Sequence, residues 1–177
     1  SHKMWKIPVY GEDLKCEKEF YVRINYYVDV KNSKEVKAML IAGQLEASCV
    51  CTTNVLSHEQ ILVAVNKALH SDNSGTMATR SVYSEVLYNL SPSLKITDSL
   101  RKFGIQDGSK EIISIQLSRS PSFYDLSQVI KGEEKPLDTL VSDEGHIAKV
   151  YDVTSEELQV GSLLEAVILR IATKEIN

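Results

Sequence analysis

The chain has 177 residues, 43% of them hydrophobic and 25% charged, a balance typical of one globular domain, here residues 1–177, that buries its own core. A net charge of −4 argues against a protein that coats nucleic acid by charge alone, so any RNA contact needs a local basic patch. Three cysteines, Cys16, Cys49 and Cys51, fit a reducing compartment better than a disulfide framework. We see no charged and then apolar leader, expect no secretory signal, and leave residues 1–3 out of the fold prediction as expected vector sequence.

The N-terminal part of the chain is predicted to form two strands followed by a helix. Residues 21–30 are rich in aromatic and β-branched side chains, which favours a strand, and residues 5–10 favour a shorter strand before it. Asn32 and Glu35 match a capping box at the start of a helix, and Gly43 is expected to end that helix.

Cys49 and Cys51 lie in the next predicted strand, residues 47–55, where a spacing of two points both side chains to the same face. A metal or redox pair needs further ligands, and no other cysteine or nearby histidine completes a set. We therefore interpret the two cysteines as small apolar side chains that pack on one face of a strand.

A long helix is predicted after Ser57, where Gln60 completes a capping box. Its buried face is formed by apolar residues at helical spacing, namely Ile61, Leu62, Ala64, Val65, Ala68 and Leu69. Asn66, Lys67 and His70 cluster on the opposite face, which is either an ordinary solvated face or a polar binding surface.

Two shorter helices are predicted next. A loop is expected at residues 72–76, and Arg80 then precedes a helix over residues 81–90. Thr97 is expected to cap a short amphipathic helix that Gly104 ends.

The remaining part before the last helix has one clear strand and little other pattern. Residues 111–117 alternate as a strand, and residues 119–142 are predicted to be a long variable loop with a short element near 124–130. Ser142 or Asp143 is expected to cap a helical turn. Because strands and helices are mixed without βαβ alternation, we predict the α+β class, with a small, mostly antiparallel sheet packed with several helices.

The last predicted helix, residues 161–174, is strongly apolar, and its apolar face is wider than packing on one side requires. This face comprises Leu163, Leu164, Val167, Ile168, Ile171 and Ala172. The helix is either sandwiched between two layers of its own fold or covered in part by another protein. It is shorter than the roughly 20 apolar residues that a membrane span needs.

Enzyme motifs are not found in the sequence. Phosphate-binding glycine loops and a nucleophile elbow are missing, and His58, His70 and His146 are scattered without metal-ligand spacing. We therefore predict no catalytic residue, no cofactor and no metal site. A non-catalytic subunit explains these observations more simply than a hidden active site.

Several ordered strings carry a resemblance to a known family. The strings ILVAVNKALH, MATRSVYSEVLYNLSP and ITDSLRKFGI, followed later by KVYDVTSEE and GSLLEAVILRIATKEI, resemble the TPRKB family, the kinase-binding subunits of the KEOPS (EKC) complex. The likeness covers residues 55–118 and 149–177, a little over half of the chain. Residues 1–45 and 119–148 match only in layout.

The resemblance implies a role in tRNA modification. KEOPS makes threonylcarbamoyl adenosine beside the anticodon of tRNAs that read codons beginning with A, and another subunit is the transferase. Members of this family bind the N-terminal lobe of the small atypical kinase/ATPase subunit and are implicated in holding the tRNA at its 3′ end. The family is not enzymatic, contacts other KEOPS subunits indirectly, has no membrane partner, and is expected in the cytoplasm and nucleus.

The resemblance also suggests which residues take these roles. The predicted kinase-binding residues are Leu163, Leu164, Val167, Ile168 and Ile171 on the last helix. The predicted tRNA-binding residues are Asn66, Lys67, His70 and Arg80, a group of modest charge that implies weak binding to tRNA by this chain alone. Whether Lys95, Arg101 and Lys102 extend this group stays open.

Two alternatives belong to other functional classes. The first is a small enzyme or ligand-binding protein with a pocket near Cys49, Cys51 and His70, which a well-formed cavity with a shifted pKa would indicate. The second is a protein whose wide helix face serves self-association, which a dimer in solution would indicate.

Overall fold

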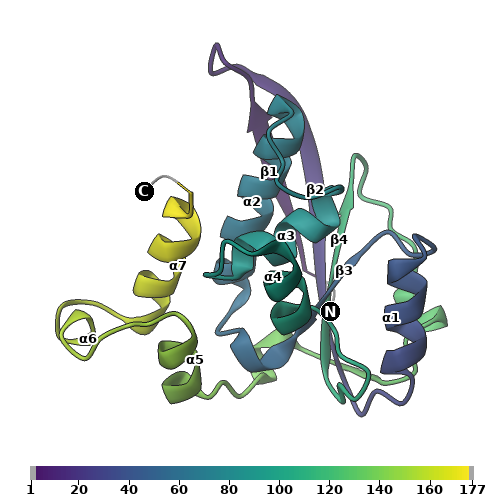
Figure 1. Ribbon diagram of the computed structural model, residues 1–177. Coiled ribbons are helices and arrows are strands. Elements are labelled where there is room, and N and C mark those ends of the chain that lie inside the picture. Colours follow the sequence, from purple (N-terminus) through teal and green to yellow (C-terminus); the bar gives the residue numbers. More distant parts are fainter. Residues whose placement is uncertain (1–2, 176–177) are drawn as a thin grey trace.

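The computed structural model describes residues 3–175, which form one antiparallel sheet with helices on both of its faces (Figure 1). The strands are β1 (Met4–Tyr10), β2 (Cys16–Val28), β3 (Ser48–Cys51), β4 (Ile112–Ser118) and β5 (Glu133–Lys135). The helices are α1 (Ser33–Ile41), α2 (His58–Ser74), α3 (Val82–Leu90), α4 (Ile96–Phe103), α5 (Glu144–Val150), α6 (Glu157–Val160) and α7 (Leu163–Thr173). The predicted α+β class is therefore confirmed. Of the expected vector residues, Ser1 and His2 lie outside the described part.

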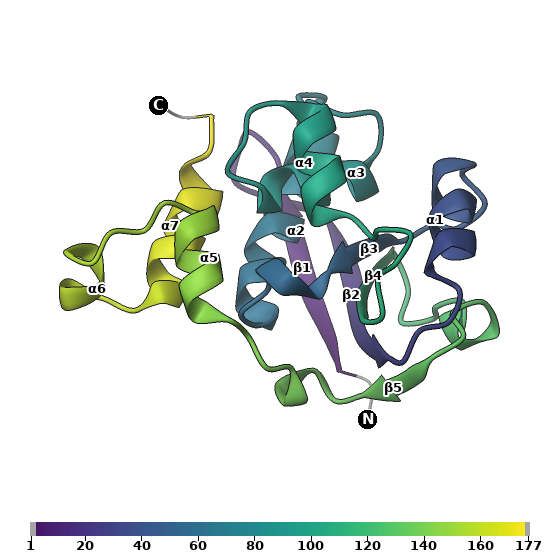
Figure 2. The ribbon, with the colours of Figure 1, turned by 60° about the horizontal axis from the view of Figure 1, so that its bottom comes forward.

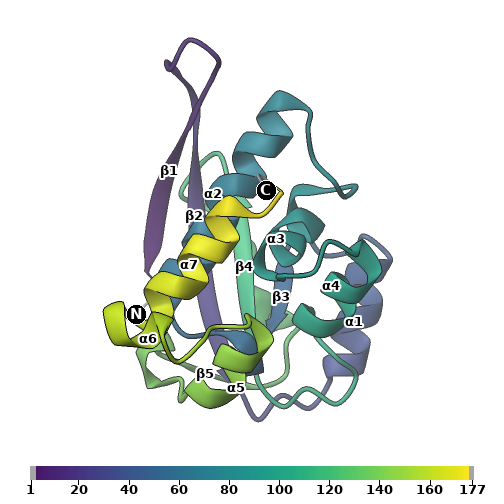
Figure 3. The same ribbon diagram turned by 60° about the vertical axis from the view of Figure 1, so that its left-hand side comes forward.

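The strands are ordered β1-β2-β4-β3, and every pairing is antiparallel. β1 pairs with β2 only as far as Arg23, the partner of Met4. β5 pairs with the last residues of β2, beyond the end of β1. The hairpin of β1 and β2 extends past the helices (Figures 1 and 3). β2 is longer than predicted because its first residues pair with β1, whereas β3 ends at Cys51 because residues 52–54 form a 3-10 turn.

The main core lies between one face of the sheet and helices α2 and α3. From the sheet it includes Val22, Ile24, Val50, Ile113 and Ile115, all buried. From the helices it includes Ile61, Ala64, Val65, Ala68, Leu69, Val86 and Leu90. The apolar face predicted for α2 is therefore the face that packs on the sheet.

A second core lies on the other face of the sheet, beneath α1 and the segment after β4. Here Tyr27, Cys49 and Ile112 pack with Val36 of α1 and with Leu126. α1 and α7 therefore occupy opposite flanks of the molecule (Figure 2). Cys49 and Cys51 pair with neighbours on the same face of β4, as the spacing predicted.

Two helices begin where predicted, α1 after Asn32 and α2 after Ser57, but without the predicted capping boxes, and the predicted start of α4 is wrong. The Asn32 side chain accepts from the N–H of Lys131 at 2.9 Å instead of capping α1. Gln60 is buried and accepts from the N–H of Leu56 at 2.7 Å, so no capping box with Ser57 forms. α4 begins after Lys95 rather than at Thr97. In the first two cases a contact outside the local motif replaces the capping box, and in the third the N-cap lies two residues before the predicted one.

Other boundaries follow the local signals. Of the two residues predicted to cap a helical turn here, Asp143 is the one that caps α5. Its side chain accepts from the N–H of His146 at 3.0 Å. The loop predicted at 72–76 is shorter than expected, because α2 continues to Ser74 and ends where Gly75 takes a φ of +70°. Residues 119–142 contain β5 and short 3-10 turns, one of them at Leu126–Gln128. Within residues 3–175, none of the helices has the length and apolarity needed to cross a membrane.

Candidate functional site

The inner face of α7 belongs to the core of the protein. Leu163, Val167 and Ile171 are buried in the main cluster, on the side of α2 that faces away from the sheet (Figure 3). Three of the five predicted kinase-binding side chains are therefore covered by their own fold. A partner can reach them only if α7 separates from α2.

The outer face of α7 carries the apolar side chains that remain accessible. Leu164 and Ile168 are half-buried and stand outside the buried cluster. Leu169 is 61% exposed and Ala172 is exposed. Leu169 was missed from the sequence because it lies among polar residues on the helical wheel. The surface formed by Leu164, Ile168, Leu169 and Ala172 is called the outer α7 face below.

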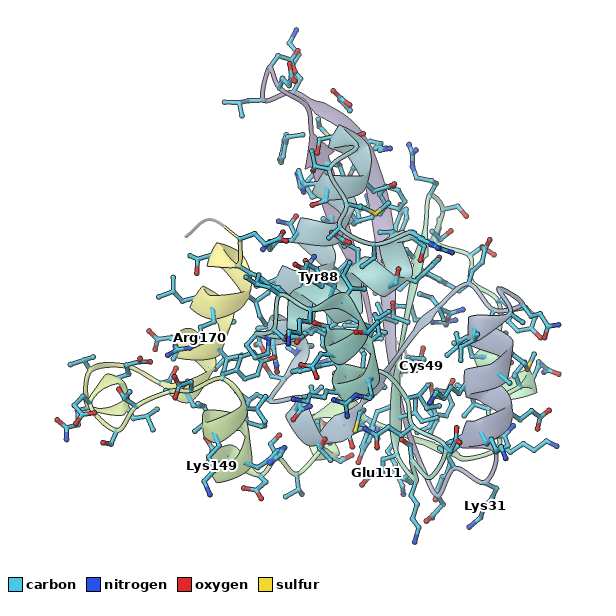
Figure 4. All side chains as sticks on the ribbon, viewed as in Figure 1. Lys31, Cys49, Tyr88, Glu111, Lys149 and Arg170 are labelled. Atoms are coloured by element: carbon cyan, nitrogen blue, oxygen red, sulfur yellow. The ribbon has the colours of Figure 1, made fainter. Side chains whose placement is uncertain are left out.

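The start of α7 is fixed by local contacts. Ser162 and Glu165 form a capping box, in which the hydroxyl oxygen of Ser162 accepts from the N–H of Glu165 at 3.1 Å. Arg170, in the last turn of α7 and labelled in Figure 4, ties the helix to the segment before it: it donates to the carboxylate of Glu157 in α6 at 2.8 Å and to the carbonyl of Asp152 at 3.0 Å. The bond from Arg170 holds the pKa of Glu157 below its usual value.

The end of α7 is fixed by Lys67 of α2. Its ammonium donates to the carbonyl oxygens of Ile171 at 2.8 Å and Lys174 at 3.2 Å. These carbonyls lie at the C-terminus of the helix, where the usual helical acceptor bonds run out and a cation is favoured by the helix dipole. Burial lowers the pKa of Lys67. The predicted phosphate contact of Lys67 therefore competes with an internal role.

Lys174 continues this arrangement toward α3. Its side chain is only 9% exposed, and its ammonium donates to the carbonyl oxygens of Tyr88 and Ser91, the latter at 2.7 Å. The ammonium also lies 3.5 Å from the centroid of the Tyr88 ring, and the Tyr88 hydroxyl donates to Glu175 at 2.5 Å. Figure 4 labels Tyr88 on α3. Sequence reasoning missed Lys174 because its partners lie more than eighty residues away.

His70 holds the β1–β2 hairpin to α2. Its Nε2 accepts from the N–H of Tyr10 at 3.2 Å, and its Nδ1 lies 2.9 Å from the carbonyl of Asn66. The rings of His70 and Tyr10 are stacked, with their centroids 6.3 Å apart. Nε2 as acceptor and Nδ1 as donor correspond to a neutral imidazole. Both ring nitrogens are therefore occupied within the fold.

Asn66 and Arg80 are the predicted tRNA-binding residues whose side chains are exposed. Arg80 lies in the loop between α2 and α3, which buried Glu85 anchors by accepting from the N–H groups of Ala78 at 3.1 Å and Thr79 at 2.9 Å. The structure thus presents Asn66 and Arg80 to solvent, while Lys67 and His70 bind within the fold.

The suggested extension of the basic group is partly neutralised. Arg101 and Lys102 both approach the carboxylate of Asp98, at 2.9 Å and 3.5 Å. Lys95 is exposed at the start of α4. Of these three cations, Lys95 is the one that is exposed without an ion pair to a described residue.

The alternative pocket near the cysteines and His70 does not form. Cys49 and Cys51 lie on the face of the sheet opposite to α2, which carries His70, so the sheet separates them. Burial raises the pKa of the Cys49 thiol to about 12, which keeps it protonated and unreactive. Across residues 3–175, no group of histidine, cysteine, aspartate and glutamate side chains could hold a metal ion.

Comparison with known proteins places this arrangement in a family. Residues 27–175 match the family model described as kinase binding protein CGI-121. The chain is 32% identical over 170 residues to the EKC/KEOPS complex subunit TPRKB of Danio rerio, covering 93% of this chain and 97% of that protein. It is 33% identical over 172 residues to the EKC/KEOPS complex subunit cgi121 of Aspergillus fumigatus, covering 86% and 90%. It is 32% identical over 134 residues to the corresponding subunit of Yarrowia lipolytica, covering 75% and 74%. The resemblance seen in the sequence is thereby confirmed, and the chain belongs to the CGI-121 family of kinase-binding proteins.

Proposed function

We propose that this chain is a non-catalytic subunit of an EKC/KEOPS complex and binds the kinase/ATPase subunit of that complex. The observation that carries the proposal is the match of residues 27–175 to a kinase-binding family. The names of the relatives from Danio rerio and Aspergillus fumigatus, which are EKC/KEOPS subunits, support the assembly. We further propose that the complex, and this chain with it, occurs in the cytoplasm and nucleus.

The outer α7 face is the proposed kinase-binding surface. Its centre is apolar, which suits a stable complex, because charged groups are depleted from the cores of such interfaces. Leu164 and Ile168 are half-buried on this face, and Leu169 is the large apolar side chain of the helix that is exposed. α7 is held by the Ser162–Glu165 capping box at its start and by Lys67 and Arg170 in its last turn, so the surface is formed before the partner arrives.

Co-purification of the chain with its cognate kinase tests this proposal. Ile168→Glu places a charge on the outer α7 face and should abolish the complex, whereas Ile41→Glu, on an isoleucine 78% exposed on α1, should leave it intact. Circular dichroism and a denaturation midpoint on both variants establish that the fold is kept. Ile168→Ala, which removes apolar surface without adding charge, should weaken the complex more mildly. A wild-type chain that does not bind the kinase contradicts the proposed function itself, and a folded Ile168→Glu that still binds it moves the interface elsewhere.

We also propose that the chain helps to hold the tRNA 3′ end during formation of threonylcarbamoyl adenosine. The exposed polar side of α2 and the following loop supply Asn66 for a base or sugar contact and Arg80 for a phosphate contact. Lys67 and His70 shape this side, with their polar atoms used within the fold. So few charges give weak, salt-sensitive binding, which fits a complex whose other subunits hold the rest of the tRNA.

Charge reversal tests the tRNA contact in the assembled complex. Arg80→Glu should lower tRNA affinity and modification while the kinase remains bound. Arg119→Glu is a matched control, because Arg119 is an exposed arginine at the end of β4, away from α2. Equal tRNA affinity of the wild type and Arg80→Glu would remove this residue from the contact.

A further inference from the structure

A row of polar side chains occupies the face of the sheet opposite to α2. The strand register sets Arg23 of β2 across from Gln116 of β4, and Asn25 across from Ser114. A pocket of about 310 Å³ opens over this row. It is lined by Arg23, Asn25, Tyr27, Gln116, Asp125, Leu126, Ser127 and Glu134.

The walls of this pocket are held in place by bonds within the protein. Gln116 donates to the carbonyl of Tyr124 at 2.9 Å, which fixes the segment that forms one wall. The carboxylate of Asp125 accepts from the N–H of Ser127 at 3.0 Å and from its hydroxyl at 2.7 Å. On the other side, Asn25 donates to the carboxylate of Glu134. The pocket is therefore shaped in advance rather than formed by closure.

One strong donor of the pocket is buried without a protein acceptor. The Nε of Arg23 has no hydrogen-bond partner among residues 3–175, while its guanidinium carbon lies 5.4 Å from the centroid of the Phe123 ring. Tyr27 lines the same pocket. Burial, with the nearby carboxylates of Glu134 and Asp125, raises the pKa of Tyr27 to about 12, so the hydroxyl is a donor at neutral pH. Buried unpaired donors are rare because they forfeit their bonds to water.

The charges around the pocket restrict what could satisfy these donors. Arg23 is the one cation of the lining, and Asp125 and Glu134 are its two carboxylates. A simple anion would meet two like charges, and a simple cation would meet the guanidinium. A small molecule that carries one charge of each sign can face the guanidinium with its negative group and the carboxylates with its positive group. A planar carboxylate also matches the fork of an arginine side chain.

We propose that this pocket binds a small zwitterion of the α-amino-acid type. The carboxylate of the ligand pairs with the guanidinium of Arg23 and accepts from the hydroxyl of Tyr27. Its ammonium lies between the carboxylates of Asp125 and Glu134, which supply the negative charge of the lining. The site lies on the other face of the sheet from α2 and α7, so it is separate from the proposed partner surfaces (Figures 1 and 2).

Binding to free amino acids tests the proposal on the full chain. Each of the common L-amino acids is titrated into the protein and followed by calorimetry and by chemical shifts of residues 23–27 and 125–127. At least one should bind, and its N-acetyl and methyl-ester forms, which each remove one charge, should bind at least tenfold more weakly.

Variants locate the site. Arg23→Met removes the guanidinium but keeps an unbranched side chain, and it should weaken binding at least tenfold. Tyr27→Phe should weaken binding severalfold with the fold intact. Arg119→Met is the matched control and should bind as the wild type does. The proposal is overturned if no amino acid binds at millimolar concentration. It is equally overturned if binding survives in folded Arg23→Met and Tyr27→Phe, or if an N-acetyl form binds as well as the free amino acid.

Discussion

The ammonium of Lys67 on α2 donates to the carbonyl oxygen of Ile171 at 2.8 Å and so closes the C-terminal end of α7. Lys174, one residue beyond α7, forms the same kind of contact with α3. Its ammonium donates to the carbonyl oxygens of Tyr88 and Ser91 at the end of that helix. Two lysines therefore link three helices through carbonyls at the C-terminal ends of α7 and α3. The position of the outer α7 face depends on this linkage.

Lys67→Met should destabilise the protein and loosen the end of α7. The variant removes two charge-assisted bonds to carbonyls at the end of α7, which we expect to lower the free energy of unfolding by about 1–3 kcal/mol. Urea denaturation measures the loss, and hydrogen exchange should show faster exchange of the last amides of α7. Lys95→Met, at an exposed lysine, is the control and should change neither. Unchanged exchange in Lys67→Met would show that the cap does not hold the helix.

Replacement of apolar residues should separate the two sides of α7. Ile171 is 1% exposed and Leu169 is 61% exposed, although they lie two positions apart. Ile171→Ala should lower the free energy of unfolding by about 2–5 kcal/mol through lost burial and a cavity. Leu169→Ala should change it by less than about 0.5 kcal/mol while weakening the kinase complex. Similar losses of stability in both variants would contradict the assignment of inner and outer faces.

The buried lysine at the end of α7 should give the protein a pH-dependent stability. Burial, with repulsion from Lys67, lowers the pKa of Lys174 from 10.5 to about 8. Between pH 8 and pH 10.5 the unfolded chain therefore binds more protons at this residue than the folded chain does, so its contribution to stability rises with pH through this window. The rise is about 1.4 kcal/mol per pH unit at most, or about 3 kcal/mol in all.

Comparison with Lys174→Met isolates this effect. The tyrosines titrate in both proteins, so their contribution cancels in the difference between the two unfolding free energies. This difference should shift in favour of the wild type from pH 8 to pH 10.5. Parallel pH profiles of the two proteins would show that Lys174 keeps its ordinary pKa in the fold.

Tyr151 should contribute through its hydroxyl as well as its ring. The hydroxyl is buried, donates to the carbonyl of Leu90 and accepts from the side chain of Gln60 at 3.0 Å. Tyr151→Phe leaves both groups without this partner, and we expect a loss of about 1–3 kcal/mol in the free energy of unfolding. Tyr124→Phe removes a hydroxyl from a tyrosine that is 59% exposed and should be neutral. A neutral Tyr151→Phe would mean that water replaces the hydroxyl.

The sequence by itself determined the local structure and the family. Alternating isoleucines predicted β4, the apolar stripe of α2 predicted the face that packs on the sheet, and ordered strings within residues 55–118 and 149–177 identified the relatives. These signals are local, because periodicity follows from the backbone geometry of a helix or a strand. Capping boxes at Asn32 and Ser57 failed because contacts with distant or buried groups replaced them.

Only the tertiary structure decided which residues are free to act. The apolar arc of α7 was wide enough for either orientation, and its contact with α2 selected Leu163, Val167 and Ile171 as core. Lys67 was predicted to meet phosphate, yet its partner Ile171 lies 104 positions away in the chain. The Arg23 pocket likewise depends on strand register and on a segment that folds back over the sheet. A helical wheel records the spacing of side chains along one element, whereas burial and pairing depend on where a second element docks, and that position is set by contacts distant in the sequence.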